Sequence, residues 1–526
     1  MKKTLWIASL VAIGALAACG NPDDPGSSSN PASSTGNESA SGKPHLELKW
    51  FVDSPANAQL PSGDADFVKK TIESKFNVTL NVEYMGLSED YNKKINTYLT
   101  SNAPPDMWRD ANSDGGQKYA LDGLLGDISQ FVTPANMPNY FKYWIDEASL
   151  NNYQVHNQFV RAPIPYSKEI YRAWYIRKDW LDKLKLPVPK TYDDYLTAIR
   201  AFSNDDPDGN GKKDTFGFTT AGGGSALGFD WPEYIKHGLT YSTFIENNKF
   251  IDSQTDPRNQ QVLDDIAKVI GEGLVDPDWF LNKNPQHIDR AAQGKVGVVL
   301  GSSKDFAYDS NPQSLQSKTK QLFPDANWVP FTPFGSTPLQ SGIAPGSPFL
   351  FHKNVVEKKP DNVRRTTEIL DWLAGEEGFL LTHYGQEGKH YTRSGNKITL
   401  NPQTFEEDIV KKGNWLAIWD FFTPDTPNVF QLEVVDPRQT DRDREIAKTI
   451  AAIPTAPYLG TSLTPPPGFD LAAFRTRQRQ LQVKAVFEDK SGKNWPVYLE
   501  ELLTKYKGNE LYNAYTEQIK AAGIIK

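Results

Sequence analysis

The densest cluster of oxygen-bearing side chains in the sequence is the segment 206–214, which reads DPDGNGKKD. With its first residue as position 1, side-chain oxygens fall at positions 1, 3, 5 and 9, a backbone carbonyl at position 7 and a glycine at position 6. This spacing reproduces much of the EF-hand loop, in which alternate residues around a tight turn surround Ca²⁺ with oxygen. The sequence therefore predicts a structural calcium site within residues 206–215, with the ligands Asp206, Asp208, Asn210, Lys212 and Asp214.

Two features of this loop depart from the standard EF-hand. Its twelfth position is Gly217, where the standard loop has a bidentate glutamate. Thr215 follows the ninth position, so that either this residue or water would have to complete the coordination shell. A solvated Asx turn without metal remains the alternative, since Asp, Asn and Gly also favour such turns.

Arg109, Asp110 and Asn112 form a second polar group, directly after the short strand-like run 106–108. In open α/β sheets, ligands bind beyond the carboxyl ends of the strands. We therefore predict that these three side chains face a ligand. The alternative is a polar loop without a role in binding.

Three tryptophans are candidates for flat binding platforms: Trp231, Trp415 and Trp419. Trp231 follows a glycine-rich loop, and Trp415 and Trp419 are four residues apart, a spacing that places them on one face if the segment is helical. An exposed aromatic ring offers a flat apolar face on which a ligand can stack, so we predict that the three rings contact ligand. Core packing is the alternative for each.

Motifs of common catalytic sites are missing from the sequence. There is no nucleophile elbow, no zinc-binding HExxH, and the glycine-rich segment 221–225 lacks the Lys-Ser/Thr ending of a phosphate-binding loop. Cys19 is the only cysteine, which excludes an internal disulfide and a cysteine-based metal site. We therefore predict that the protein is not an enzyme. The alternative is a glycoside hydrolase, which needs only two facing carboxylates, and the sequence has 65 acidic residues.

The N-terminus has the pattern of an export signal. Lys2 and Lys3 precede an apolar run from Leu5 to Leu16, shorter than the roughly 20 residues of a spanning helix. The following Leu-Ala-Ala-Cys19 resembles the lipobox of bacterial lipoproteins, in which the cysteine is acylated after cleavage. This resemblance implies a signal peptide over residues 1–18 and a lipid anchor at Cys19, with an ordinary secretory signal as the alternative.

Composition sets the domain organisation. Residues 19–44 contain almost no large apolar side chain and are predicted to be a flexible tether. The remaining chain is too long for one core, which predicts two or more lobes. A formal net charge of −8 disfavours nucleic acid as a partner, because nucleic-acid binding needs a basic surface.

Alternating strands and helices predict an α/β fold with mostly parallel sheets. The expected elements are strands at 46–52 and 78–84, helices at 65–76 and 91–101, a helix ending near 202 and a strand at 215–218. These elements place the calcium loop at a helix–strand corner and Arg109 at the end of a strand.

Several segments, in order, resemble the extracellular solute-binding proteins of bacterial ABC importers, especially the maltose-binding and oligosaccharide-binding branches. The segments are 105–108, 119–128, 159–165, 174–181, 189–194, 293–298 and 384–391. The resemblance implies a two-lobed fold with hinge crossings: lobe 1 from 45–165, lobe 2 from 166–340, and the remaining segments of both lobes within 341–526. Relatives that bind alginate-type oligosaccharides carry a similar calcium loop, with an acidic residue at the place of Thr215.

The same resemblance implies a function. The protein would be a monomer on the extracellular face of the cell membrane that traps a carbohydrate between its lobes and delivers it to the permease subunits of an ABC importer. The positive side chains of Arg109, Arg161 and Lys389 are compatible with an acidic as well as an uncharged sugar. A lipid-anchored glycoside hydrolase and a sugar sensor for a signalling partner are the alternatives.

Overall fold

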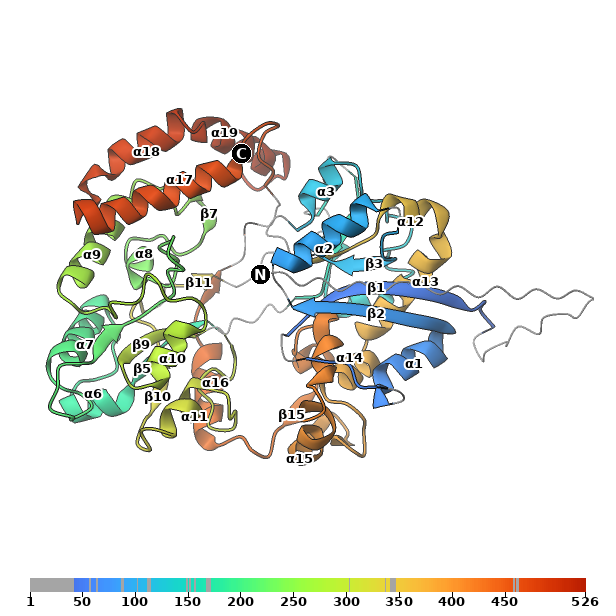
Figure 1. The fold of residues 1–526 in the computed structure, drawn as a ribbon, viewed down its shortest axis with the longest axis horizontal. Coiled ribbons are helices and arrows are strands. Elements are labelled where there is room, and N and C mark those ends of the chain that lie inside the picture. Colours follow the sequence, from blue (N-terminus) through green and yellow to red (C-terminus); the bar gives the residue numbers. More distant parts are fainter. Residues whose placement is uncertain are drawn as a thin grey trace, which may run out of the picture.

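The structure is a computed structural model, and its two lobes are drawn in Figure 1. It describes residues 42–526 except 56–57, 63–64, 87–88, 102, 111–114, 148–149, 151–152, 156–157, 167–171, 302, 336, 341–346, 457–458 and 460–462. Cys19, Asn112, the predicted signal peptide and most of the predicted tether lie outside the described residues. Within them, no helix combines the length and apolar character needed to cross a membrane.

Lobe 1 is built on a five-stranded sheet with the strand order β2-β1-β3-β12-β4. Its strands are β1 (Leu46–Ser54), β2 (Val78–Gly86), β3 (Met107–Arg109), β4 (Arg161–Pro163) and β12 (Pro348–Leu350). A second, three-stranded sheet consists of β13 (Tyr391–Ser394), β14 (Lys397–Leu400) and β15 (Glu433–Val435). The helices of this lobe are α1 (Phe67–Phe76), α2 (Glu89–Thr100), α3 (Gln117–Leu121), α4 (Pro138–Tyr143), α12 (Lys353–Lys358), α13 (Pro360–Leu373), α14 (Glu376–His383) and α15 (Pro402–Phe405).

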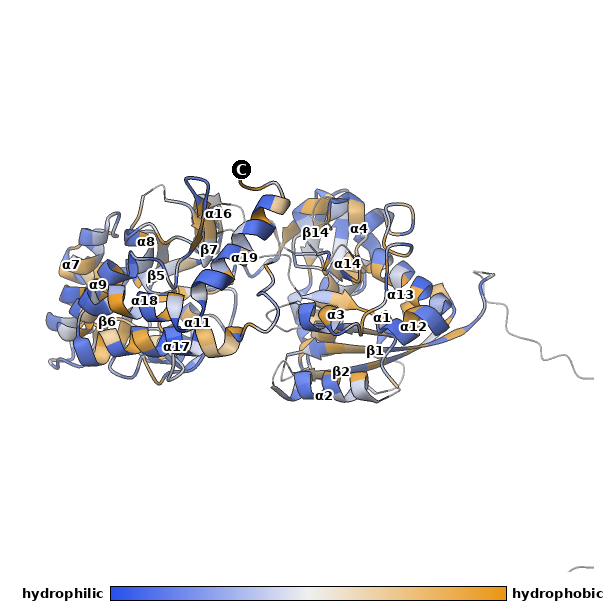
Figure 2. Cartoon of the chain, turned by 90° about the horizontal axis from the view of Figure 1, so that it is seen from above, coloured by the Kyte–Doolittle hydropathy of each residue, from blue (hydrophilic) through white to orange (hydrophobic). Residues whose placement is uncertain are grey.

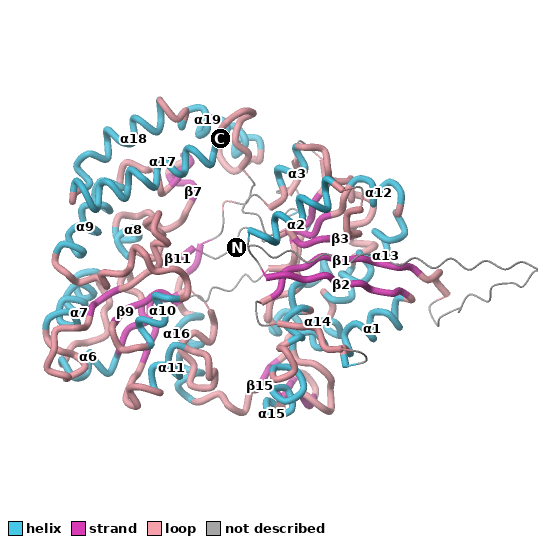
Figure 3. Tube along the Cα trace, in the orientation of Figure 1, coloured by secondary structure: helices cyan, strands magenta, loops and turns pink. Residues whose placement is uncertain are grey.

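Lobe 2 is built on a four-stranded sheet with the order β10-β5-β9-β6. Its strands are β5 (Ala173–Arg177), β6 (Phe216–Phe218), β9 (Val296–Gly301) and β10 (Trp328–Phe331), and β7 (Thr243–Glu246) and β8 (Lys249–Asp252) form a separate hairpin. Its helices are α6 (Lys178–Leu184), α7 (Tyr192–Asn204), α8 (Pro232–Lys236), α9 (Asn259–Gly271), α10 (Gln286–Ala292), α11 (Leu315–Lys320), α16 (Asp441–Ala451), α17 (Leu471–Lys484), α18 (Trp495–Thr504) and α19 (Gly508–Ala521). Figure 3 shows the strands gathered inside each lobe with helices around them.

The chain passes between the lobes three times. The crossings lie between β4 and β5, between β11 (Leu339–Gln340) and β12, and between β15 and α16. Each lobe has its own large apolar core, and Figure 2 shows apolar strands inside and polar helix surfaces outside. The region after residue 340 therefore divides: β12 to β15 complete lobe 1, and α16 to α19 complete lobe 2.

The two-lobed α/β fold is as predicted, but the strand directions are more mixed than expected. β1 pairs parallel with β2 and β3, and β6 pairs parallel with β9. β12 pairs antiparallel with both β3 and β4, and β5 pairs antiparallel with both β9 and β10. β4 is the last strand of lobe 1 before a crossing, and β5 and β12 are the first strands after one. In the main sheets of the two lobes, only the two strands that follow a crossing, β12 and β5, run against their neighbours, whereas β4 keeps the direction of β3.

Helix α7 illustrates how the sequence fixes this architecture. A capping box between Thr191 and Asp194 starts the helix by satisfying free backbone N–H groups. Its buried residues include Tyr195, Ala198, Ile199 and Phe202, a helical spacing that turns one face to the core of lobe 2. The helix then ends immediately before the predicted calcium loop.

Candidate ligand-binding site

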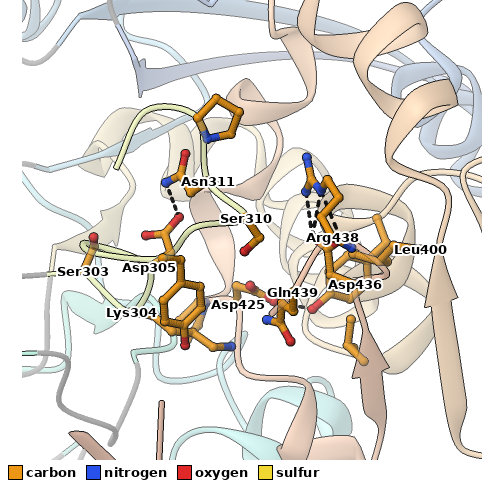
Figure 4. Close-up of a pocket in the computed structure, with 15 residues that line it drawn as sticks. Ser303, Lys304, Asp305, Ser310, Asn311, Leu400, Asp425, Asp436, Arg438 and Gln439 are labelled. Carbon is orange, nitrogen blue, oxygen red and sulfur yellow. Dashed lines mark hydrogen bonds and ion pairs between the residues drawn. The ribbon is translucent and has the colours of Figure 1, made fainter. Parts of the chain in front are cut away.

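A cavity of about 570 Å³ lies between the lobes (Figure 4). Lobe 2 contributes residues that follow strand β9, and lobe 1 contributes residues from α14 onward, including the loop that leads back to lobe 2. The lining residues are Ser303, Lys304, Asp305, Tyr308, Ser310, Asn311, Pro312, Tyr384, Leu400, Pro424, Asp425, Val434, Asp436, Arg438 and Gln439. Because both lobes line the cavity, a molecule bound there would contact both.

The cavity wall is rich in paired polar groups. Asn311 Nδ2 donates to Asp305 Oδ2 over 2.6 Å, and the Tyr384 hydroxyl donates to Asp425. Arg438 Nη2 donates to Asp436 Oδ2 over 2.7 Å. These contacts hold three carboxylates at the cavity surface, where their remaining lone pairs can accept hydrogen bonds from a ligand.

Tyr308 has a buried hydroxyl with no hydrogen-bond partner among the described residues. Its side chain lines the cavity although the residue is only 3% exposed. Burial, together with Asp305 and Asp443, raises the pKa of this phenol to about 12, so the hydroxyl keeps its proton. A buried polar group without a partner is unfavourable by about 1–3 kcal/mol. Because this oxygen is covered in the structure, a ligand hydroxyl would accept from it only after the ring or its neighbours move.

A charged cluster lies at the carboxyl ends of β1 and β3. Arg109 Nη1 is 2.5 Å from both Asp53 Oδ1 and Asp53 Oδ2, and the Tyr91 hydroxyl donates to the Arg109 carbonyl over 2.6 Å. Asp420 interacts electrostatically with Arg109, Asp53 and Asp425, which connects this cluster to the cavity. The Asp420 side chain is exposed, and its ionised form is favoured by Arg109 and opposed by Asp425 and Asp53.

Asp110, the predicted neighbour of Arg109, does not share its exposure, although the charge of Asp110 acts on Tyr91 of this cluster. Asp110 is fully buried, and its backbone N–H donates to the Pro348 carbonyl over 2.8 Å, so the residue packs against β12. Asn112 lies outside the described residues. Of the five described residues predicted to face ligand, Arg109 is the one whose side chain is partly exposed.

The prediction for the three tryptophans is corrected by their burial. Trp231 is 0% exposed and packs its ring 4.9 Å from that of Trp279, within the core of lobe 2. Trp415 and Trp419 are each 1% exposed and lie in the core of lobe 1. A sugar platform must expose one face of its ring, and these rings have none exposed.

Two of these indoles support local structure instead. Trp415 Nε1 donates to the Asp408 carbonyl over 3.2 Å, and Trp419 Nε1 donates to Asp66 Oδ2 over 3.0 Å. Asp66 caps helix α1, so Trp419 stabilises that cap. Lys389 was one of the positive residues compatible with an acidic ligand. In the structure its Nζ lies 2.6 Å from Asp408 Oδ2, so its charge is already paired.

The acidic loop at residues 206–214 places its oxygen atoms close together. Asp206 accepts from the backbone N–H groups of Asn210 and Gly211 over 3.0 and 2.9 Å. The Asn210 Nδ2 donates to Asp208 Oδ2 and Asp214 Oδ1 over 2.8 and 3.1 Å, so a neutral amide sits among the carboxylates. The pKa of Asp208 is raised by burial and by the neighbouring Asp206. This donor set is of the hard oxygen type that suits Ca²⁺.

Other contacts limit how many ligands the loop can supply. Lys295 Nζ lies 2.6 Å from Asp214 Oδ2, and the Thr215 hydroxyl donates to the Phe202 carbonyl over 2.7 Å. A Cβ atom at Gly217 would lie 2.3 Å from Ile199 Cβ, which explains why the twelfth position cannot carry glutamate. Among the described residues, no group of three or more His, Cys, Asp or Glu side chains is arranged to hold a metal.

Sequence reasoning missed most of the cavity wall. Asp305 and Tyr308 follow the carboxyl end of β9, so the strand-end rule that selected Arg109 would have found them. Asp425, Asp436 and Arg438 lie in loops of the later segment, where the sequence shows no periodic pattern. Tertiary folding alone brings them to the cavity.

Over 422 residues, the chain is 23% identical to the polygalacturonan/rhamnogalacturonan-binding protein YtcQ of Bacillus subtilis, covering 77% of each chain. It is 26% identical over 307 residues to the lipoprotein LipO of the same organism, covering 57% of this chain and 59% of LipO.

Solved structures share the fold. An HMO-binding solute-binding protein of Bifidobacterium longum infantis superposes with a TM-score of 0.67 at 17% identity, covering 90% of this chain and 98% of its own. The substrate-binding protein FusA of Streptococcus pneumoniae gives a TM-score of 0.64 with kestose, at 16% identity, and 0.65 as an EF-hand mutant with fructo-nystose, at 15% identity; both cover 91% of this chain and 99% of their own. Residues 68–386 match the family described as bacterial extracellular solute-binding protein, and the chain therefore belongs to that family.

Proposed function

We propose that this protein captures an oligosaccharide between its two lobes and delivers it to an ABC importer. The observation that carries the proposal is the polar cavity lined by residues of both lobes. Hydroxyl groups of a sugar can donate to Asp305 and Asp425 and accept from Tyr308, so the wall is complementary to a polyol. The carbohydrate ligands named for YtcQ and FusA support the assignment.

Closure of the lobes around the sugar follows from this geometry. A ligand in the cavity would bridge the segment after β9 and the segment around Asp425, and hinge closure would bury it. The permease subunits of the importer would then distinguish the closed, loaded form from the open one. We propose that the protein acts as a monomer in this cycle.

The anchor and location are part of the same proposal. Cys19 would carry acyl chains that hold the protein on the extracellular face of the membrane, because multiple chains anchor stably where one does not. The lipoprotein name of LipO supports this assignment.

We further propose that residues 206–214 bind a structural Ca²⁺. Asp206, Asp208 and the Lys212 carbonyl would be ligands, Asn210 would present its amide oxygen after a flip, and Asp214 would join by releasing Lys295. The cation would relieve repulsion between the carboxylates and fix the corner between α7 and β6. The EF-hand named for FusA supports the proposal.

The test of the function is a thermal-shift screen of the purified protein against plant and microbial oligosaccharides. A ligand at about 100 times its Kd should add roughly 2.7 kcal/mol of stability. Each hit is then incubated with the protein and assayed for new reducing ends. A binding protein leaves the glycan intact, whereas release of reducing ends would instead indicate a glycoside hydrolase.

A further inference from the structure

The cations at the cavity and its adjoining charged cluster are largely engaged by carboxylates. Arg438 is paired with Asp436, and Arg109 is paired with Asp53. A guanidinium that already binds one carboxylate has less capacity to bind another from a ligand. Lys304 is the exception among the described lining residues, because no carboxylate contact is seen for it.

Carboxylates outnumber the cations in the same region. Asp305 and Asp425 line the cavity, and the contacts seen for both are with neutral donors, Asn311 and the Tyr384 hydroxyl. Asp420 adds a third carboxylate near Asp425. Arg109 favours the ionised form of Asp420, whereas Asp425 and Asp53 oppose it. A ligand carboxylate placed beside Asp305 and Asp425 would therefore meet like charges.

We propose that this cavity selects uncharged oligosaccharides and rejects uronates of the same size, an inference that rests on the proposed function. It separates this chain from YtcQ, whose named ligands are polygalacturonan and rhamnogalacturonan. A neutral sugar offers hydroxyl donors to Asp305 and Asp425, which stabilises it. The carboxylate of a uronate offers only acceptors at neutral pH and would face the same two carboxylates, with Lys304 as the opposing cation.

Matched ligands isolate the effect of charge. Trigalacturonate is compared with its methyl ester, and kestose is compared with its C6-oxidised carboxylate, by calorimetric titration of the purified protein. We expect binding by the neutral member of at least one pair. We expect its anionic counterpart to bind at least about tenfold more weakly, as one or two unfavourable charge contacts at intermediate dielectric would produce.

A variant then identifies the source of the discrimination. Asp425→Asn removes one negative charge from the cavity wall. It should reduce the difference in affinity between the neutral and the anionic member of each pair. Asp182→Asn is the control, because it removes one negative charge on helix α6, where Asp182 pairs with Lys178. It should leave the difference in affinity unchanged.

Each result has a distinct meaning. If the anionic member of either pair binds as tightly as its neutral partner, the proposed charge selection is overturned. It is also overturned if Asp425→Asn leaves the difference in affinity between the two members unchanged. Absence of binding by all four compounds and by the wider sugar panel would instead contradict the proposed function.

Discussion

Arg109 Nη1 lies 2.5 Å from both carboxylate oxygens of Asp53, which joins the carboxyl ends of strands β3 and β1. Both side chains remain partly exposed, at 25% for Arg109 and 15% for Asp53. The contact fixes the charged edge of lobe 1 beside Asp420, and it occupies the cation that sequence reasoning had assigned to a ligand. The charge available for binding thus differs from what the residue types alone suggest.

The buried indoles should govern stability and leave sugar affinity unchanged. Trp231→Ala should lower the free energy of unfolding by roughly 3–5 kcal/mol, because it leaves a cavity beside Phe218 and Trp279. Trp231→Phe keeps a ring and should fold with a smaller loss. Calorimetric titration of folded Trp231→Phe should give the wild-type affinity for sugar. A large loss of affinity without a loss of stability would show instead that Trp231 contacts the ligand.

Glu233 should make stability depend on pH. This carboxyl is fully buried, accepts from the Tyr192 hydroxyl over 2.8 Å, and has a pKa raised from 4.5 to about 7, chiefly by burial; Asp265 opposes its ionisation and Lys236 favours it. The folded state therefore holds the proton more tightly than the unfolded state. Its contribution is fully present below pH 4.5 and is lost as pH rises to 7 and above.

Glu233→Gln tests this dependence. Relative to the variant, the wild type should lose roughly 1–3 kcal/mol of unfolding free energy between pH 4.5 and 8. Urea titrations at several pH values measure the difference. Glu510→Gln, on the exposed surface of α19, is the matched control and should follow the wild type. Parallel pH curves for wild type and Glu233→Gln would contradict the prediction.

Calcium should stabilise lobe 2 without changing sugar affinity. Chelation should lower the Tm, and Asp206→Ala combined with Asp208→Ala should lower it similarly and abolish the response to Ca²⁺. Lys295→Met should tighten Ca²⁺ binding, because Lys295 no longer competes for Asp214. Equal Tm values with a chelator and with millimolar calcium would remove the basis for the site.

Cys19→Ala should release the protein from the membrane or leave it unprocessed, because the acylated sulfur is the proposed anchor. Fractionation of cells into membrane, soluble and secreted material measures the outcome, with the wild type as reference. If the variant stayed in the detergent-dependent membrane fraction, another feature would have to anchor the chain.

Local patterns predicted the elements more accurately than the site. The strand expected at 46–52 is β1 (Leu46–Ser54), and the helix expected at 65–76 is α1 (Phe67–Phe76), because alternation and helical spacing directly encode buried faces. Trp415 and Trp419 could not be assigned from spacing, since core packing and ligand stacking require the same aromatic residues. Burial decides between them, and burial is a tertiary property.

Long-range partners were also invisible in the sequence. The oxygen spacing at 206–214 indicates a cation loop, but Lys295, which competes for Asp214, is distant in sequence and comes from the segment before β9. Asp425 and Asp305 meet at the cavity only because the chain crosses between the lobes three times. Strand-end reasoning would have found Asp305, and no local rule would have found Asp425.

The measurement that tests the central claim most directly is calorimetric titration of Tyr308→Phe with an oligosaccharide that binds the wild type. This substitution removes one hydroxyl that has no partner among the described residues, so stability should stay unchanged or rise slightly. Tyr192→Phe is the control, because its hydroxyl bonds Glu233 in the core of lobe 2.

We predict that at least one oligosaccharide binds the wild type and that Tyr308→Phe weakens it about three- to tenfold, the effect of one hydrogen bond, while Tyr192→Phe loses stability and keeps affinity. A folded Tyr308→Phe that binds every sugar like the wild type, or a wild type that binds none, would contradict sugar capture in the cavity between the lobes.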